Sequence, residues 1–123
     1  MKEGLSHTST LTVNEQNTAI AMGSGDMPVL ATPAMMALME NAAMIAVKKA
    51  LDDGQTTVGG HIDSSHLMPS AIGAEVSATA ILTKVDGRKL YFHITAKMGE
   101  DVIGEGNHLR FIVNKERFLD KLK

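Results

Sequence analysis

Apolar residues fill almost every position between residues 32 and 51, in the stretch TPAMMALMENAAMIAVKKAL. Its charged and amide side chains are few, namely Glu40, Asn41 and the pair Lys48 and Lys49. A helix that is apolar on nearly every side is normally enclosed by other elements rather than laid on a surface. The pattern therefore predicts one long helix around which the rest of the chain folds.

Short signals mark both ends of this helix. Thr32 precedes Pro33, and a threonine side chain can accept hydrogen bonds from the free N–H groups of a first helical turn, where proline also fits. Gly54, in the sequence DDG, can adopt the left-handed conformation that closes a helix. We therefore expect Thr32 to cap the helix and residues 52–54 to close it.

The segments around the helix have the patterns of strands and loops. Residues 7–18 alternate loosely and suit a short strand, whereas residues 22–31 contain two glycines and a proline and are typical of a loop. Further strands are predicted at residues 56–67, 73–87, 88–99 and 100–114. Asp86 and Gly87 form a tight hairpin signature, so the last three strands predict an antiparallel meander. The final KERFLDKLK suits one or two helical turns.

One apolar helix with about five strands can bury its surfaces if the sheet curls around the helix. This arrangement is an α+β fold, and 123 residues suit a single domain. Five strands would still leave one sheet edge and part of the helix uncovered, and pairing of two subunits would cover both. We therefore expect a homodimer or a higher oligomer.

Charge and composition narrow the class of function. The 12 basic and 14 acidic residues are mixed along the chain, so neither nucleic acid nor an anionic membrane is an expected partner. The first ten residues lack the apolar core of a signal peptide, and no apolar run is long enough to span a membrane, which predicts a cytoplasmic protein. The chain has no cysteine and therefore no thiolate nucleophile. No glycine-rich phosphate loop occurs, which disfavours nucleotide hydrolysis.

Glu40 is the first candidate for chemistry, because a carboxylate within apolar packing loses water and becomes a stronger base or nucleophile. It could equally lie on an exposed strip with Asn41, which would require no function. Thr32 stands eight residues earlier, about 12 Å away along a helix axis. Capping alone would explain this threonine, but the free N–H groups beside it could also hold the oxyanion of a reacting carbonyl.

Histidines supply the other candidates. His66 lies where a strand meets a proline turn, so it could act as a general acid or orient a carbonyl, or be an ordinary surface histidine. Its odd spacing from His61 sends the two side chains to opposite faces of a regular strand. A metal site of His61, Asp63 and His66 lacks a further ligand at a recognised spacing, and we expect neither a metal nor a cofactor. His108 and Arg110 share one side of a strand, where the arginine could meet a carboxylate or phosphate, although a solvated sheet edge would also account for both.

Three motifs, in their order and spacing, resemble the fluoroacetyl-CoA thioesterase family, a branch of the hot-dog-fold acyl-CoA thioesterases. They are ATPAMMALMENAA, VGGHIDSSHLMPS and IGEGNHLRFIVNKERF, and the likeness runs from residue 5 or so to residue 118. The resemblance implies a long helix wrapped by a curved antiparallel sheet, in dimers whose active sites lie at the subunit interface. It also implies hydrolysis of an acyl-CoA thioester.

The resemblance assigns roles to particular residues of this chain. The catalytic residues that it implies are Thr32, Glu40 and His66. Gly59 would lie beside the thioester, and other neighbours of the acyl or CoA portion would be Gly60, His108 and Arg110. The sequence leaves open whether the carboxylate of Glu40 activates water or attacks the acyl carbon to form an anhydride.

One departure from the family bears on the substrate. The fluoroacetyl-CoA enzyme has phenylalanines just ahead of its catalytic threonine, whereas residues 21–31 of this chain contain no aromatic residue. We therefore expect a thioesterase for short or medium acyl groups, with an adaptable pocket lined by methionine and alanine. Two rival functions stay open. One is a non-catalytic hot-dog domain that binds an acyl-CoA. The other is a hydratase, which would need an aspartate and a histidine to add water to an enoyl group, but Asp63 and His66 lie too close along one strand for this role.

Overall fold

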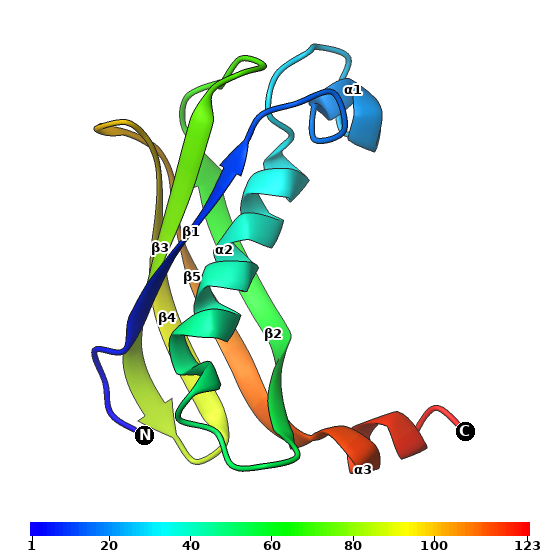
Figure 1. Ribbon diagram of the computed structural model, residues 1–123, viewed down its shortest axis with the longest axis vertical. Helices are drawn as coiled ribbons and strands as arrows, with labels where there is room; N and C mark the ends of the chain where they lie inside the picture. Colours follow the sequence, from blue (N-terminus) through cyan, green and yellow to red (C-terminus); the bar gives the residue numbers. More distant parts are fainter.

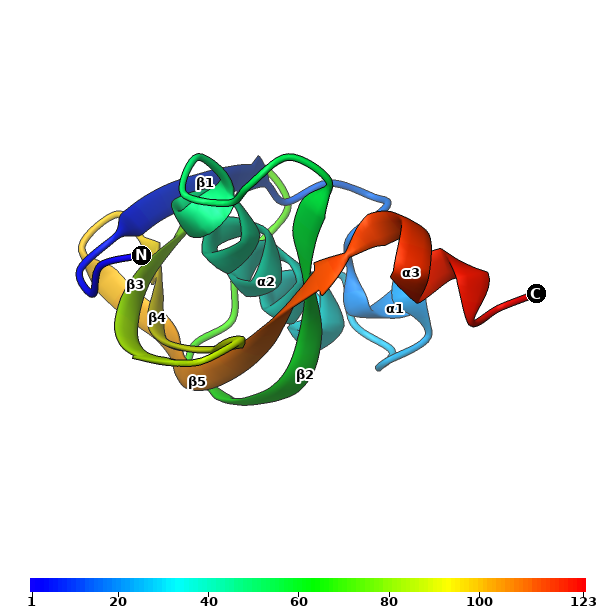
Figure 2. The same ribbon diagram turned by 90° about the horizontal axis from the view of Figure 1, so that it is seen from below.

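The computed structural model describes all residues from 1 to 123 and contains the predicted long helix and curved sheet. Figure 1 shows the helix α2 lying across one face of a five-stranded sheet, and Figure 2 shows the strands curving around it. The elements in chain order are β1 (Ser6–Thr12), α1 (Ala19–Met22), α2 (Thr32–Lys48), β2 (Gln55–His66), β3 (Glu75–Asp86), β4 (Lys89–Met98), β5 (Asp101–Asn114) and α3 (Lys115–Asp120). The α+β hot-dog architecture is thus confirmed. None of these helices has the length and apolar character that crossing a bilayer requires.

The sheet has the strand order β1-β3-β4-β5-β2, and all neighbouring strands are antiparallel. The predicted meander of β3, β4 and β5 is confirmed, and Gly87, at φ 61°, makes the tight turn between Asp86 and Lys89. The strand β2 follows the helix in the chain but pairs with β5. Both β1 and β2 therefore present a free edge.

The core lies between α2 and the concave face of the sheet. Large helix side chains such as Met35 and Met39 are fully buried there, opposite small strand residues such as Ala78, Ala80 and Ala96. Small residues in the strands leave room for the helix to approach the sheet, and tight packing of this kind stabilises the fold. The helix packs mainly on β1 and β3 and more sparsely on β2 and β4.

One side of α2 stays partly open within a protomer. Met36, Glu40 and Met44 are only half-buried, and Thr32 is exposed at the start of the same stripe. Residues four apart lie on one face of a helix, so these four side chains form a continuous row beside β2. The helix is therefore enclosed on part of its circumference only, and the open part carries two of the candidate catalytic residues.

Several details of the predicted secondary structure were wrong. The first strand, predicted over residues 7–18, ends at Thr12. Thr32 is the first residue of α2 and does not cap it, because the cap position belongs to Ala31 and no side chain accepts from the first turn. The helix ends at Lys48, and Gly54, at φ 81°, serves the later turn into β2. Residues 19–22 form a single helical turn, α1, which is capped by the Thr18 side chain and was not predicted.

Candidate active site

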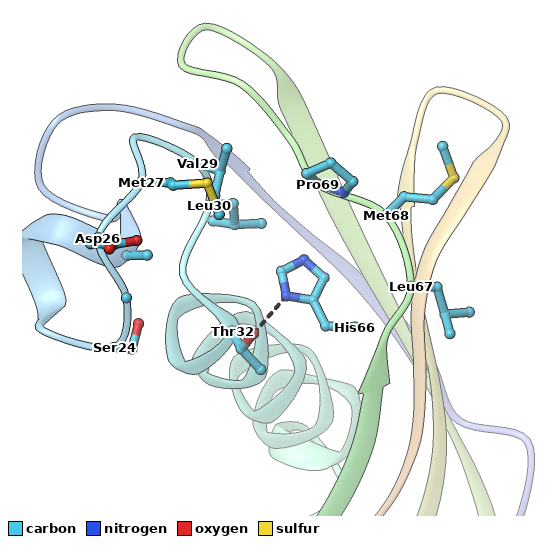
Figure 3. A pocket seen from close by; sticks show the side chains of 12 residues that line it. Ser24, Asp26, Met27, Val29, Leu30, Thr32, His66, Leu67, Met68 and Pro69 are labelled. Carbon is cyan, nitrogen blue, oxygen red and sulfur yellow. Dashed lines mark hydrogen bonds between the residues drawn. The ribbon is translucent and has the colours of Figure 1, made fainter.

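Thr32 and His66 meet because α2 begins and β2 ends at the same end of the molecule. The Thr32 hydroxyl lies 2.7 Å from Nδ1 of His66, as Figure 3 shows. Such a distance is that of a good hydrogen bond. The Thr32 side chain was expected to accept a hydrogen bond from its own helix, but it forms its hydrogen bond with the His66 imidazole instead.

The environment of His66 favours the neutral imidazole. Loss of water around the ring lowers the pKa of His66, and the nearby Met68 backbone offsets part of this effect. Its Nε2 atom is buried and has no hydrogen-bond partner of good geometry. When the Thr32 hydroxyl donates to Nδ1, Nε2 carries a proton and can donate a hydrogen bond to a carbonyl oxygen or a departing thiolate.

This pair forms part of the wall of a cavity of about 310 Å³. The loop after α1 supplies one side of the cavity, with Met27, Val29 and Leu30, and the segment after β2 supplies the other, as Figure 3 shows. Its only carboxylate is that of Asp26, and no phenylalanine, tyrosine or tryptophan lines it. The volume is at the small end of the range for ligand pockets, which suits a compact acyl group.

Glu40 belongs to a second cluster near the middle of α2. Its Oε2 lies 3.8 Å from Nη1 of Arg110, and its side chain is 43% exposed. The carboxylate is thus only partly sheltered by one protomer. Asn41 turns instead toward β1, where it accepts a hydrogen bond of 2.7 Å from Ser9. The two neighbours therefore do not form the common exposed strip that one reading of the sequence allowed.

No hydrogen bond or ion pair joins Glu40 to Thr32 or His66 within one protomer. Thr32 and Glu40 lie two turns apart on α2. The Thr32–His66 pair and the Glu40 carboxylate are therefore separate clusters. The family resemblance implied that three catalytic residues act together, whereas a single subunit brings together only two of them.

Gly59 is the point where β2 passes the carboxylate. A Cβ atom on this residue would lie 2.9 Å from Glu40 Oε2 and 3.5 Å from Cε1 of His108, which is closer to the oxygen than side chains tolerate. The absence of a side chain therefore lets the carboxylate approach the strand backbone. Gly60 is the extra residue of a bulge, and a side chain there would clash with the ring of Phe111. Both glycines are exposed on the free edge of β2.

His108 and Arg110 lie on the helix-facing side of β5, with exposed fractions of 2% and 6%. A solvated sheet edge is therefore excluded as their environment. Desolvation is the main cause that lowers the pKa of each group, and the charge of Glu40 acts in the opposite direction on both. Contact with the acyl or CoA portion of a substrate remains a prediction for these residues. The sequence analysis did not single out Thr57, whose hydroxyl accepts a hydrogen bond from Arg110, because no motif marks this threonine.

His61 and Asp63 lie on the outer face of β2, with their side chains 3.6 Å apart. His66 faces the helix side, so the prediction that the two histidines occupy opposite faces is confirmed. The three residues considered for a metal site do not converge. Asp63 and His66, the pair considered for a hydratase, therefore point to opposite faces of β2.

Comparisons with known proteins show the family to which this chain belongs. A family model described as fluoroacetyl-CoA-specific thioesterase matches residues 13–116. The fluoroacetyl-CoA thioesterase of Streptantibioticus cattleyicolor is 36% identical over 95 residues, which cover 77% of this chain and 68% of that protein.

Solved structures show the same architecture. A threonine-to-serine variant of a fluoroacetyl-CoA thioesterase, in complex with acetyl-CoA, superposes with a TM-score of 0.93 at 30% identity, over 99% of this chain and 96% of that one. A thioesterase superfamily member from Thermus thermophilus has a TM-score of 0.91 at 24% identity, over 98% of this chain and 90% of that one. The latter likeness concerns the fold alone.

Proposed function

This chain belongs to the fluoroacetyl-CoA-specific thioesterase family and is an acyl-CoA thioester hydrolase, and we propose that its substrates carry short or medium acyl groups. The observation that carries the proposal is the cavity of about 310 Å³ with the Thr32–His66 pair in its wall. Methionine, leucine, valine and proline make up half of the 12 residues that line it, and flexible methionines can adapt to several acyl chains. The products would be a free acid and CoA.

The proposed reaction uses all three catalytic candidates. Glu40 either removes a proton from water, whose oxygen attacks the carbonyl carbon, or attacks that carbon itself and forms an anhydride that water then cleaves. In both cases the C–S bond breaks and water supplies the proton that the departing thiolate takes up, while the Nε2–H group of His66 donates a hydrogen bond to the carbonyl oxygen or the departing sulfur. Thr32 fixes the imidazole through its 2.7 Å hydrogen bond. Backbone N–H groups of Gly59, Gly60 or the start of α2 hold the oxyanion.

A homodimer is part of this proposal, because one protomer separates the carboxylate from the imidazole. The free edge of β2 can pair with the same strand of a second copy, which also covers the open stripe of α2. Antiparallel pairing directs the His66 end of one β2 toward the Gln55 end of the other. The partner's Glu40 then approaches the Thr32–His66 pair.

A panel of acyl-CoA substrates tests the proposed function. Release of free thiol is measured with acetyl-, butyryl-, hexanoyl-, octanoyl- and palmitoyl-CoA. We expect the highest kcat/KM among the shorter chains and a steep decrease for the palmitoyl group, which exceeds the cavity. Preference for the longest chain would contradict the proposed acyl specificity. Thermal stabilisation by acyl-CoA without thiol release would indicate a binding protein instead.

A further inference from the structure

Most of the large apolar side chains that are exposed on this protein gather in two sets, at opposite ends of β2. The first set surrounds the acyl cavity at the His66 end, and we call it the cavity-end surface. It consists of Ile20, Met22, Met27, Leu67, Met68 and Ile72. The second set belongs to α3 and the turn after it, and it consists of Phe118, Leu119 and Leu122. Concentrated exposure of this kind commonly marks an interaction site.

The helix α3 finds little to pack against in its own protomer. None of its residues is buried, and it packs mainly on β5. Phe118 lines a small cavity with Arg88 and Val113, which anchors the helix to the end of the sheet. Leu119 and Leu122 are 56% and 76% exposed. Residues three apart lie on one face of a helical turn, so these leucines form an apolar face without a partner in the protomer.

The position of α3 is fixed by the first residues of β2. Asn114, directly before α3, pairs with Gln55, and the Lys115 N–H group donates to the Gly54 carbonyl oxygen at 2.9 Å. Figures 1 and 2 both show α3 extending beyond the β2 edge of the sheet. The 12 residues of β2 separate this end from His66 by about 36 Å. The leucines of α3 therefore cannot reach the cavity of their own protomer.

Antiparallel pairing of two β2 strands brings the two apolar sets together. The Gln55 end of one strand then lies beside the His66 end of the other, and each α3 comes next to residues 67–72 of its partner. The charges are also complementary. Residues 115–123 contain four basic and two acidic side chains, whereas Asp26 is the only charged residue within 22–31 and 67–72.

We propose that α3 of each subunit packs through Leu119 and Leu122 on the cavity-end surface of its partner and closes the open side of the acyl cavity. The proposal rests on the proposed function, including its homodimer. Met27, Leu67 and Met68 belong both to this surface and to the cavity wall, so a helix packed on them becomes part of that wall. The partner's helix then limits the length of the acyl chain, since residues 21–31 offer no aromatic side chain to do so.

Cross-linking tests the docking directly, because the chain has no cysteine of its own. Ala71→Cys, beside the cavity-end surface, is combined with Lys123→Cys, beside Leu122, and both positions are exposed. The two residues lie too far apart in one chain for a short bismaleimide, so a cross-link must join two subunits. Dilute protein should give mostly covalent dimers on denaturing electrophoresis.

A second cysteine pair provides the matched control for cross-linking. Thr10→Cys is combined with the same Lys123→Cys, since Thr10 is equally exposed but lies on β1, at the opposite edge of the sheet. This pair should give few covalent dimers. Equal cross-linking of the two pairs would show random collision and would overturn the docking.

Acyl-chain selectivity tests the closure of the cavity. Leu119→Ser and Leu122→Ser are combined in one chain, and kcat/KM is measured with octanoyl-CoA and butyryl-CoA. Opening the wall should raise the octanoyl-to-butyryl ratio by about tenfold, the lower end of what a contact with methylene groups is worth. Leu119→Met with Leu122→Met keeps the apolar face and should leave the ratio within about twofold of wild type. Ile81→Ser, at an exposed isoleucine of β3, is the control and should not change the ratio.

Three results would overturn the proposal. A monomeric wild-type protein, or a dimer that gives no cross-link between residues 71 and 123, would overturn the docking of α3. Cross-linking with an unchanged octanoyl-to-butyryl ratio in the double serine variant would overturn the closure of the cavity. Absence of thiol release by the wild-type protein on every acyl-CoA would instead overturn the proposed function, and the cross-links would still report whether α3 packs on the partner.

Discussion

The two halves of the candidate site are built differently. The Thr32–His66 half lies where a helix begins and a strand ends, and loop residues surround it on an open cavity. The Glu40–Arg110 half lies in the middle of α2, β2 and β5, where regular elements and a buried hydrogen-bond network fix each group. Loops vary more in sequence among related proteins than the helices and strands that they connect. Under the proposed function, the loop half contacts the acyl group and the sheet half supplies the carboxylate in a fixed place.

Loss of the carboxylate should have the largest effect. Glu40→Gln should lower kcat by about a hundredfold or more, the scale for removing a positioned base, without loss of the fold. Thiol release and thermal unfolding measure the two quantities. Glu105→Gln, on the outer face of β5, is the matched control and should be fully active. Wild-type turnover in Glu40→Gln would remove the sheet half from the mechanism.

Mixed dimers test whether the two halves of a site come from different subunits. Differently tagged Glu40→Gln and His66→Ala chains are expressed together, and thiol release is compared with that of each variant alone. If each site combines the two subunits, a mixed dimer keeps one intact site, and random pairing restores about a quarter of wild-type activity. A site contained in one chain would give no restored activity in the mixture.

The pH dependence of stability distinguishes the two imidazoles from ordinary histidines. Burial lowers the folded-state pKa of both His66 and His108, so the unfolded chain binds protons more readily. Stability should therefore be fully present above about pH 6.5, the unfolded value, and should decrease as the pH falls toward the folded values. Thermal unfolding between pH 7.5 and pH 5.5 measures this decrease, and His66→Gln and His108→Gln should each make it smaller. An unchanged slope in both variants would contradict the assignment.

The smallest expected effect concerns the loop half. Asp26 is the only carboxylate that lines the cavity, and its charge should disfavour acyl groups that are themselves anionic. Because the side chain is exposed, Asp26→Asn should raise kcat/KM for succinyl-CoA relative to butyryl-CoA by only about two- to fivefold. Ser24→Ala, in the same loop, provides a control without a charge change. Equal ratios in Asp26→Asn and the wild-type protein would show that this loop does not select by charge.

The sequence predicted the elements better than it predicted their ends. The long helix was predicted correctly because a nearly continuous apolar stretch of about 20 residues suits an enclosed helix, and the four later strands because short β-rich segments bounded by turn signals report local structure directly. The one-turn helix α1 was missed, since four residues contain too little of a period to recognise. The capping role of Thr32 was wrong because the same hydroxyl has a better partner in His66, 34 residues away along the chain.

The sequence by itself determined that one apolar helix is wrapped by an antiparallel sheet, and it supplied the residues with catalytic chemistry. The tertiary structure alone decided which of them meet. It placed β2 beside β5, so that Arg110, His108 and Thr57 enclose one guanidinium next to Glu40. Local patterns depend on neighbours along the chain, whereas these contacts arise from the packing of segments far apart in sequence.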